Sequence, residues 1–202
     1  NSPANATINA AESTISGFEL ETTWLATQNL VLTMNATFSD GDIDEYDDDQ
    51  ITIADTSVPP AAGCNRVNLS VLQIDSCPND RSAENLPRLA EQTYLVAAQY
   101  NLETNLGAFL PRIQASWKKD MEFCFDAASC TTERFFEDEQ FDLSARITWI
   151  SSDENWVGAI YGSNLTDEDY LVGAVALVES SGVGGFAVAP PRMYGAELEY
   201  RF

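Results

Sequence analysis

The segment Pro191-Arg-Met-Tyr-Gly-Ala-Glu-Leu-Glu-Tyr-Arg-Phe202, at the end of the 202-residue sequence, is its most informative stretch. Its residues alternate between an apolar face and a mostly polar face, as in a β-strand. The apolar face carries Tyr194, Ala196, Leu198, Tyr200 and Phe202, and the other carries Met193, Gly195, Glu197, Glu199 and Arg201. A soluble protein seldom ends on a strand with an exposed aromatic residue. A membrane barrel presents one strand face to lipid and the other to water, so the segment predicts a barrel strand.

Composition excludes several classes of function. The sequence has no apolar run of about 18 residues, which a transmembrane helix would need. Its formal net charge is −22 at pH 7, so nucleic acid is not an expected partner. It contains no His, which rules out imidazole-based catalysis and His–metal coordination. We therefore expect neither an enzyme nor a bound cofactor.

The same alternation recurs along the chain and predicts seven strands. In residues 139–150 it separates a lipid face with Phe141, Leu143, Ile147 and Trp149 from a polar face with Asp142 and Arg146. The expected strands lie near residues 14–25, 30–40, 92–102, 109–119, 139–150, 155–165 and 192–202. Leu198, Tyr200 and Phe202 extend the expected lipid face to the last strand.

The connections between these segments alternate strictly in length. Short connections follow the first, third and fifth strands, and the long ones are residues 41–91, 120–138 and 166–190. Tight turns at one end and long loops at the other are typical of an outer-membrane barrel. We therefore predict an all-β, antiparallel up-and-down meander that forms part of a transmembrane β-barrel. A secreted or cell-surface β-sandwich that binds carbohydrate or protein is the alternative, because its strands also alternate.

Several segments resemble TonB-dependent outer-membrane receptors, in the order found in that family. They are Ile15-Ser-Gly-Phe-Glu-Leu-Glu21 with Trp24, Leu30–Phe38 with the acidic stretch after it, Asn85-Leu-Pro87 with Tyr94, Trp156–Tyr170, and Pro190–Phe202. The fourth, Trp-Val-Gly-Ala-Ile-Tyr-Gly-Ser-Asn-Leu-Thr-Asp-Glu-Asp-Tyr, is the most specific. The resemblance covers nearly the whole chain and identifies residues 1–202 with the C-terminal part of the receptor barrel.

This resemblance implies a barrel of about 22 strands that encloses an N-terminal plug. The seven strands here would be the last seven, and the plug is not among the 202 residues, so we expect no transport by this chain alone. The family imports a scarce large solute (a siderophore, vitamin or glycan) with energy from the inner membrane. The implied location is the outer membrane, with a periplasmic C-terminus and extracellular long loops that gate or bind the solute.

The partners implied are outer-membrane lipid and lipopolysaccharide, the receptor's own N-terminal barrel and plug, TonB through that plug, and the barrel-assembly machinery. Gly195, Leu198, Tyr200 and Phe202 resemble the C-terminal assembly signal of the family. The charged residues of the polar faces are candidates for contact with the plug or the solute, or for pairing across strands. They are Glu19, Glu21, Arg112, Lys118, Asp142, Arg146, Glu197, Glu199 and Arg201.

Four Cys residues occur as two closely spaced pairs, Cys64 with Cys77 and Cys124 with Cys130. Local disulfides are the simplest interpretation and indicate an oxidising compartment, with free thiols as the alternative. The acidic stretch 40–49 supplies seven carboxylates. Asp40, Asp42 and Asp44 form a weak candidate for a divalent-cation site, and a solvated loop is the simpler interpretation.

Overall fold

The computed structural model describes residues 12–45, 47–69, 72–80, 82, 86–123, 135–177 and 183–202. It divides into two compact units, one containing Gly41–Leu86 and the other containing Ser16–Asp40 and Pro87–Phe202. The described residues form strands and connections, and no helix among them is long and apolar enough to cross a membrane.

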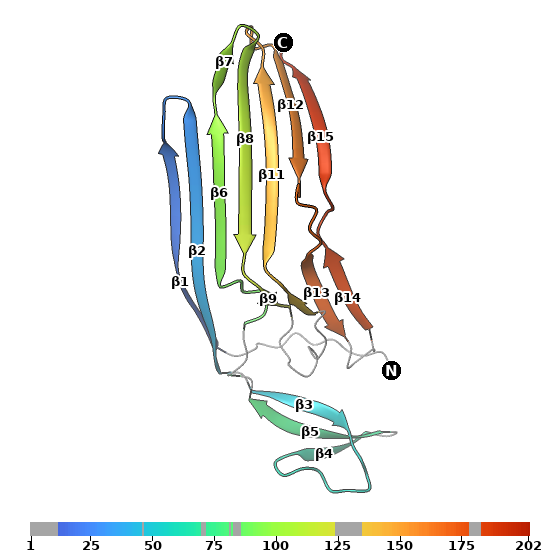
Figure 1. Cartoon of the computed structure of the whole chain (residues 1–202). Helices are drawn as coiled ribbons and strands as arrows, with labels where there is room; N and C mark the ends of the chain where they lie inside the picture. Colours follow the sequence, from blue (N-terminus) through green and yellow to red (C-terminus); the bar gives the residue numbers. More distant parts are fainter. Residues whose placement is uncertain are drawn as a thin grey trace. The chain divides into compact units, whose positions relative to one another are not determined.

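One large sheet contains the seven expected strands, in sequence order (Figure 1). They are β1 (Glu12–Leu25), β2 (Leu30–Glu45), β6 (Gln92–Tyr100), β8 (Gly107–Lys118), β11 (Gln140–Ile150), β12 (Trp156–Ser163) and β15 (Met193–Tyr200), and the short β7 (Leu102–Thr104) pairs with β8. Neighbouring strands from β2 to β15 pair antiparallel. The all-β antiparallel meander predicted from the sequence is confirmed.

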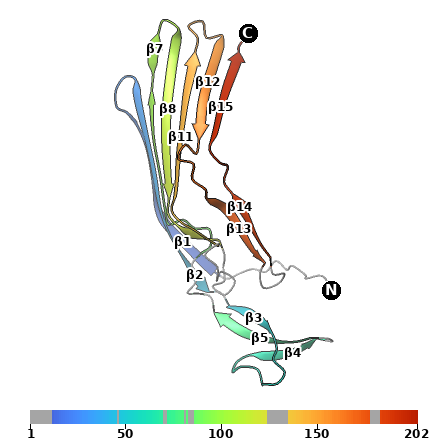
Figure 2. The same ribbon diagram turned by 45° about the vertical axis from the view of Figure 1, so that its right-hand side comes forward.

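The strands from β6 to β15 form a single layer, and among the described residues of their unit no second sheet lies against either face (Figure 2). Among the described residues, no large side chain is less than 2% exposed. A β-sandwich buries a core between two layers. The alternative of a β-sandwich is therefore wrong.

Three short turns and the C-terminus lie at one end of this sheet (Figure 1). At the turn before β8, Gly107 has a φ of 114°, and a Cβ there would lie 2.0 Å from the carbonyl oxygen of Ile150. Thr104 holds the same turn, since its Oγ1 donates to the oxygen of Gly107 at 2.8 Å. The indole of Trp149 donates to the oxygen of Leu106 at 2.8 Å. The turn requires glycine because backbone atoms occupy the space of a side chain.

The first long connection contains a sheet rather than an open loop. Its strands are β3 (Asp47–Ile53), β5 (Leu72–Asp80) and β4 (Asn65–Leu69), in that spatial order. The acidic stretch 40–49 also differs from the predicted loop, because β2 continues through Glu45 and β3 begins at Asp47. The acidic residues of this stretch favoured a solvated loop. Ile43 lies between them and is only 4% exposed, so the stretch also has a buried apolar position.

A disulfide and an ion pair hold this small sheet together. Cys64 and Cys77 are bonded, with an S–S distance of 2.05 Å, whereas Cys124 and Cys130 lie outside the described residues. Arg66 donates to both carboxylate oxygens of Asp75, at 2.7 and 2.8 Å, across the β4–β5 pair. These hydrogen bonds hold the pKa of Asp75 below its usual value.

The other two long connections also carry strands, and these share a small hydrophobic core. The strands are β9 (Met121–Glu122) with β10 (Phe136–Glu137), and β13 (Leu171–Leu177) with β14 (Val183–Val188). We call the buried residues Met121, Phe123, Phe135 and Ala174 the loop core. Ala90 and Leu171 pack against it. Segments from all three long connections therefore meet at one end of the sheet.

Polar contacts join the same segments. The backbone N–H of Leu171 donates to the carboxylate of Glu137 at 2.8 Å. Arg88 bridges two connections, because its N–H donates to the oxygen of Glu122 at 2.6 Å and its guanidinium to the oxygen of Ala174 at 3.3 Å. The structure thus replaces the three separate loops expected from the sequence with connections that contact one another.

Candidate functional site

The strand register assigns the side chains of the large sheet to two faces. Directly opposed residues of antiparallel strands share a face, and alternate residues along a strand share it too. Arg112 is opposed to Arg146, Arg146 to Tyr161, and Tyr161 to Gly195. We call the face that carries these residues the polar face and the other the apolar face.

Among the residues that the structure describes, the apolar side chains of the large sheet are widely exposed. The apolar face carries Phe141, Leu143, Ile147, Trp149, Leu198 and Tyr200. Ile160 lies opposite Ile147 on this face and is 60% exposed, and Leu198 is 71% exposed. Soluble monomers rarely expose a contiguous apolar surface of this kind, which marks a membrane or partner contact.

Aromatic residues lie opposite glycines on the last three strands. The opposed pairs are Trp149 with Gly158, Tyr161 with Gly195, and Gly162 with Tyr194. A Cβ at Gly195 would lie 2.3 Å from the ring of Tyr161, so this ring occupies the space that the glycine leaves free. These pairs explain why the sequence of β12 alternates weakly: its glycines interrupt the apolar face and Tyr161 adds an aromatic residue to the polar face.

The polar face brings together most of the charged candidates. Arg112, Lys118, Asp142, Arg146, Glu197 and Glu199 share it through the register. Glu19 reaches the same side, because it lines a hollow with Lys118 and Asp142. Glu21 lies two residues further along β1, and Arg201 follows β15 and pairs with Glu199 at 2.8 Å.

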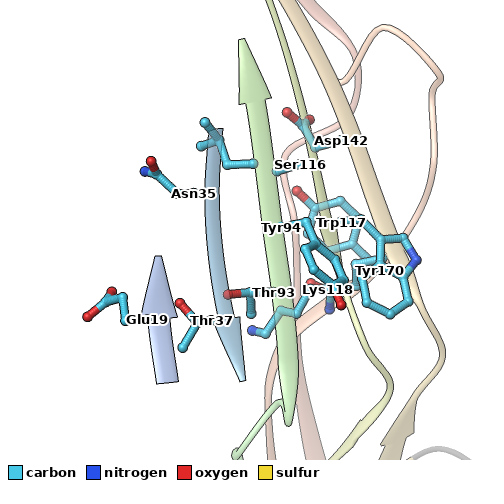
Figure 3. Close-up of a pocket in the computed structure, with 12 residues that line it drawn as sticks. Glu19, Asn35, Thr37, Thr93, Tyr94, Ser116, Trp117, Lys118, Asp142 and Tyr170 are labelled. Atoms are coloured by element: carbon cyan, nitrogen blue, oxygen red, sulfur yellow. The ribbon is translucent and has the colours of Figure 1, made fainter. Parts of the chain in front are cut away.

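The first hollow of this face has a volume of about 360 Å³ and lies near the end of the strands that leads to the long connections (Figure 3). Glu19, Lys118 and Asp142 line it together with Tyr170, which precedes β13. Burial, and then the charge of Asp142, raise the pKa of Tyr170 above its usual value. Alternation does not single out Tyr170 as a site residue, because it belongs to no alternating segment.

The second hollow lies around Arg146 and has a volume of about 260 Å³. The guanidinium of Arg146 pairs with Glu197 at 2.5 Å and donates to Thr148 Oγ1 at 3.2 Å. It also lies over the ring of Tyr161, 5.4 Å from the centroid. Arg112 lines the same hollow and donates to the side-chain oxygen of Gln114 at 3.1 Å.

Cross-strand pairing therefore accounts for only some of the charged candidates. Arg146 of β11 pairs with Glu197 of β15, whereas Arg201 pairs with Glu199, two residues before it in the same segment. Within the part of the chain that the structure describes, no ion pair involves Glu19, Glu21, Arg112, Lys118 or Asp142. The polar face thus presents unpaired charges of both signs, which can bind polar or charged groups of a partner.

Asn164 connects the end of β12 to the segment before β13. It is 3% exposed and has a φ of 47°. Its side chain donates to the oxygens of Glu168 and Pro190, at 2.8 and 3.3 Å, and accepts from the N–H of Glu168 at 3.0 Å. These bonds hold the segment after β12 against Pro190, which precedes β15.

The described residues contain no group of three or more His, Cys, Asp or Glu side chains arranged to hold a metal ion. Asp40, Asp42 and Asp44 occupy alternate positions of β2, and Asp44 accepts a hydrogen bond from Thr14 at 2.6 Å. The geometry of this stretch is that of an acidic strand.

The structure is similar to solved outer-membrane receptors. The ferric yersiniabactin uptake receptor FyuA from Yersinia pestis matches 96% of this chain, with a TM-score of 0.66 and 15% identity. The ferric-catecholate import receptor Fiu from Escherichia coli K12 matches 94%, with a TM-score of 0.51 and 13% identity. Both are TonB-dependent receptors, and the chain has the fold of part of their barrel.

The chain spans 24% of the length of FyuA and 28% of that of Fiu. The sequence matches no family profile and no curated protein. At these identities the likeness describes the fold.

Proposed function

We propose that this chain is the C-terminal part of the barrel of a TonB-dependent outer-membrane receptor that imports a scarce large solute. The observation that carries the proposal is a single-layer antiparallel meander with an exposed apolar face and a charged polar face. Lipid covers the apolar face, and the polar face lines the interior of the barrel. The ferric cargoes named for FyuA and Fiu favour a ferric siderophore over a vitamin or glycan.

The proposal also assigns each end of the sheet to one side of the outer membrane. The short turns and the C-terminus are periplasmic, and the connections 41–91, 120–138 and 166–190 are extracellular and contact the solute. A plug outside these 202 residues fills the barrel and binds TonB, which supplies energy from the inner membrane. Lipopolysaccharide and outer-membrane lipid surround the apolar face.

The test is the behaviour of the intact receptor in its own cells. We expect extraction from the outer membrane only by detergent, slower gel mobility after boiling, and loss of growth on a ferric siderophore after deletion of the gene. A protein that is monomeric and soluble without detergent would refute the barrel. A barrel whose deletion leaves growth on every iron source unchanged would refute iron uptake and redirect the search to vitamins and glycans.

The C-terminal residue offers a separate prediction about assembly. Phe202 contacts Tyr200 edge to face, with ring centroids 5.0 Å apart, and Tyr200 contacts Trp156 at 4.8 Å. Phe202→Ser should lower the surface level of the intact receptor several-fold, because it removes the terminal aromatic ring of the proposed assembly signal. Surface labelling measures this, and Arg201→Ser is the adjacent control. Equal surface levels for the two variants would contradict the prediction.

A further inference from the structure

Two arginines face each other directly across the pairing of β8 and β11. Arg112 and Arg146 are opposed in register, and both line the second hollow of the polar face. Like charges at directly opposed positions destabilise a sheet unless other groups compensate them. The sequence has only 10 Lys and Arg residues against 32 Asp and Glu, so this juxtaposition occurs in a chain where carboxylates are abundant.

The charges of this hollow do not balance. Glu197 compensates Arg146, whereas Arg112 donates only to the neutral amide of Gln114. The residue opposed to Arg112 on its other side, Gln99, is also neutral. Across the described residues no carboxylate pairs with Arg112, so two positive charges meet one negative charge. The hollow therefore lacks one negative charge.

Neutral donors surround the same space. Ser144, Ser163 and Tyr161 line the hollow beside the two arginines. A volume of about 260 Å³ accommodates a carboxylate group and several waters, since a water occupies roughly 30 Å³ in the liquid. The guanidinium fork binds a carboxylate through two parallel hydrogen bonds. A carboxylate supplies the single missing charge, whereas a phosphate group carries about −1.5 to −2 at pH 7.

We propose that Arg112, together with Arg146 and the hydroxyl groups around them, binds a carboxylate on the polar face. The carboxylate comes either from an acidic side chain of a receptor segment seated against this face or from a free solute. Tyr161 and Glu197 fix Arg146 from two sides and so preorganise one half of the site. The site rests on the proposed function only because that function encloses the polar face inside the barrel.

The test is the thermal unfolding of the intact purified receptor in neutral detergent, with Arg112→Gln and a matched control. Arg192→Gln removes the same charge, but Arg192 lines neither hollow and its ion pair with Asp167 is exposed. We expect Arg112→Gln to lower the unfolding midpoint by about 1–2 °C and Arg192→Gln to change it by roughly 0.5 °C or less. If no carboxylate is bound, Arg112→Gln removes only repulsion, and a midpoint that is unchanged or raised in sodium chloride and in sodium acetate alike overturns the proposal.

A comparison of the unfolding midpoints in sodium acetate and in sodium chloride, at equal ionic strength, distinguishes the two sources of the carboxylate. If the carboxylate belongs to the protein, the midpoint of Arg112→Gln lies below that of the wild type by the same amount in both salts. A free carboxylate makes acetate raise the midpoint of the wild type and not that of Arg112→Gln. If Arg112→Gln fails to assemble, Arg112→Lys, which keeps the charge without the fork, replaces it and should also unfold below the wild type. If the variant forms a barrel with normal heat-modifiable mobility, and its unfolding midpoint equals that of the wild type in both salts, the site is refuted. The proposed function is then left intact.

Discussion

The Gly107→Ala variant of the intact receptor is expected to fail in assembly. The new Cβ would lie 2.0 Å from the carbonyl oxygen of Ile150 and 2.8 Å from the carbonyl carbon of Ser151, and neither backbone atom can move without displacing β11. The φ of 114° adds strain for any residue with a side chain. Together these costs exceed about 4 kcal/mol, a range reserved for disruptive substitutions. The measurement is the heat-modifiable fraction of the receptor in the outer membrane.

Two glycines provide matched controls for this prediction. Gly63 has a φ of 89° but no atom within 4 Å of the position that a Cβ would take, so Gly63→Ala isolates the cost of the backbone conformation. Gly185 has open space and no such φ, so Gly185→Ala tests the loss of glycine alone. We expect normal assembly for Gly185→Ala and a loss of about 1–2 kcal/mol for Gly63→Ala. Assembly of Gly107→Ala at the level of Gly185→Ala would contradict the geometry of the turn.

The second large effect is expected where a charge is placed on the apolar face. Met34 is 44% exposed on β2, opposite Val96, which is 51% exposed. If lipid covers this face, Met34→Lys costs about 2–4 kcal/mol near the bilayer midplane. The neighbouring residue, Asn35, lies on the polar face and lines the first hollow beside Glu19 and Asp142.

Asn35→Lys is therefore the matched control, since it adds the same charge one residue away but into a hollow that contains carboxylates. We expect Met34→Lys to lower the free energy of unfolding in lipid vesicles and Asn35→Lys to leave it nearly unchanged. Urea titration of the refolded receptor measures both. Equal losses for the two variants would show that the faces are not exposed to different solvents.

Period-2 alternation predicted the large sheet well because each of its strands has two chemically different faces. The expected ranges 30–40 and 139–150 correspond to β2 and β11, and by register Arg112, Lys118, Asp142 and Arg146 share one face. The strands of the long connections escaped prediction because alternation does not specify them. The sheet of β3 to β5 is held by a disulfide and an ion pair, Cys64–Cys77 and Arg66–Asp75, and β13 is held by contacts with β9 and β10.

The candidate site was predictable as a list of charges but not as an arrangement. Alternation placed Arg112 and Arg146 on polar faces of their strands, whereas only the register shows that they are opposed. Tyr161 was missed because the glycines of β12 weaken its pattern. Tyr170 was missed because tertiary contacts, and not local sequence, bring it to Asp142.

The loop core has a mechanical consequence. Arg88, β9–β10 and β13–β14 come from three different connections, yet they share apolar contacts and backbone hydrogen bonds. A displacement of β13–β14 that separates Ala174 from Phe135 also breaks the bond from Arg88 and uncovers Met121. Movements of β9–β10, of β13–β14 and of the segment around Arg88 are therefore concerted, so a displacement of one hairpin is transmitted to the other hairpin and to Arg88.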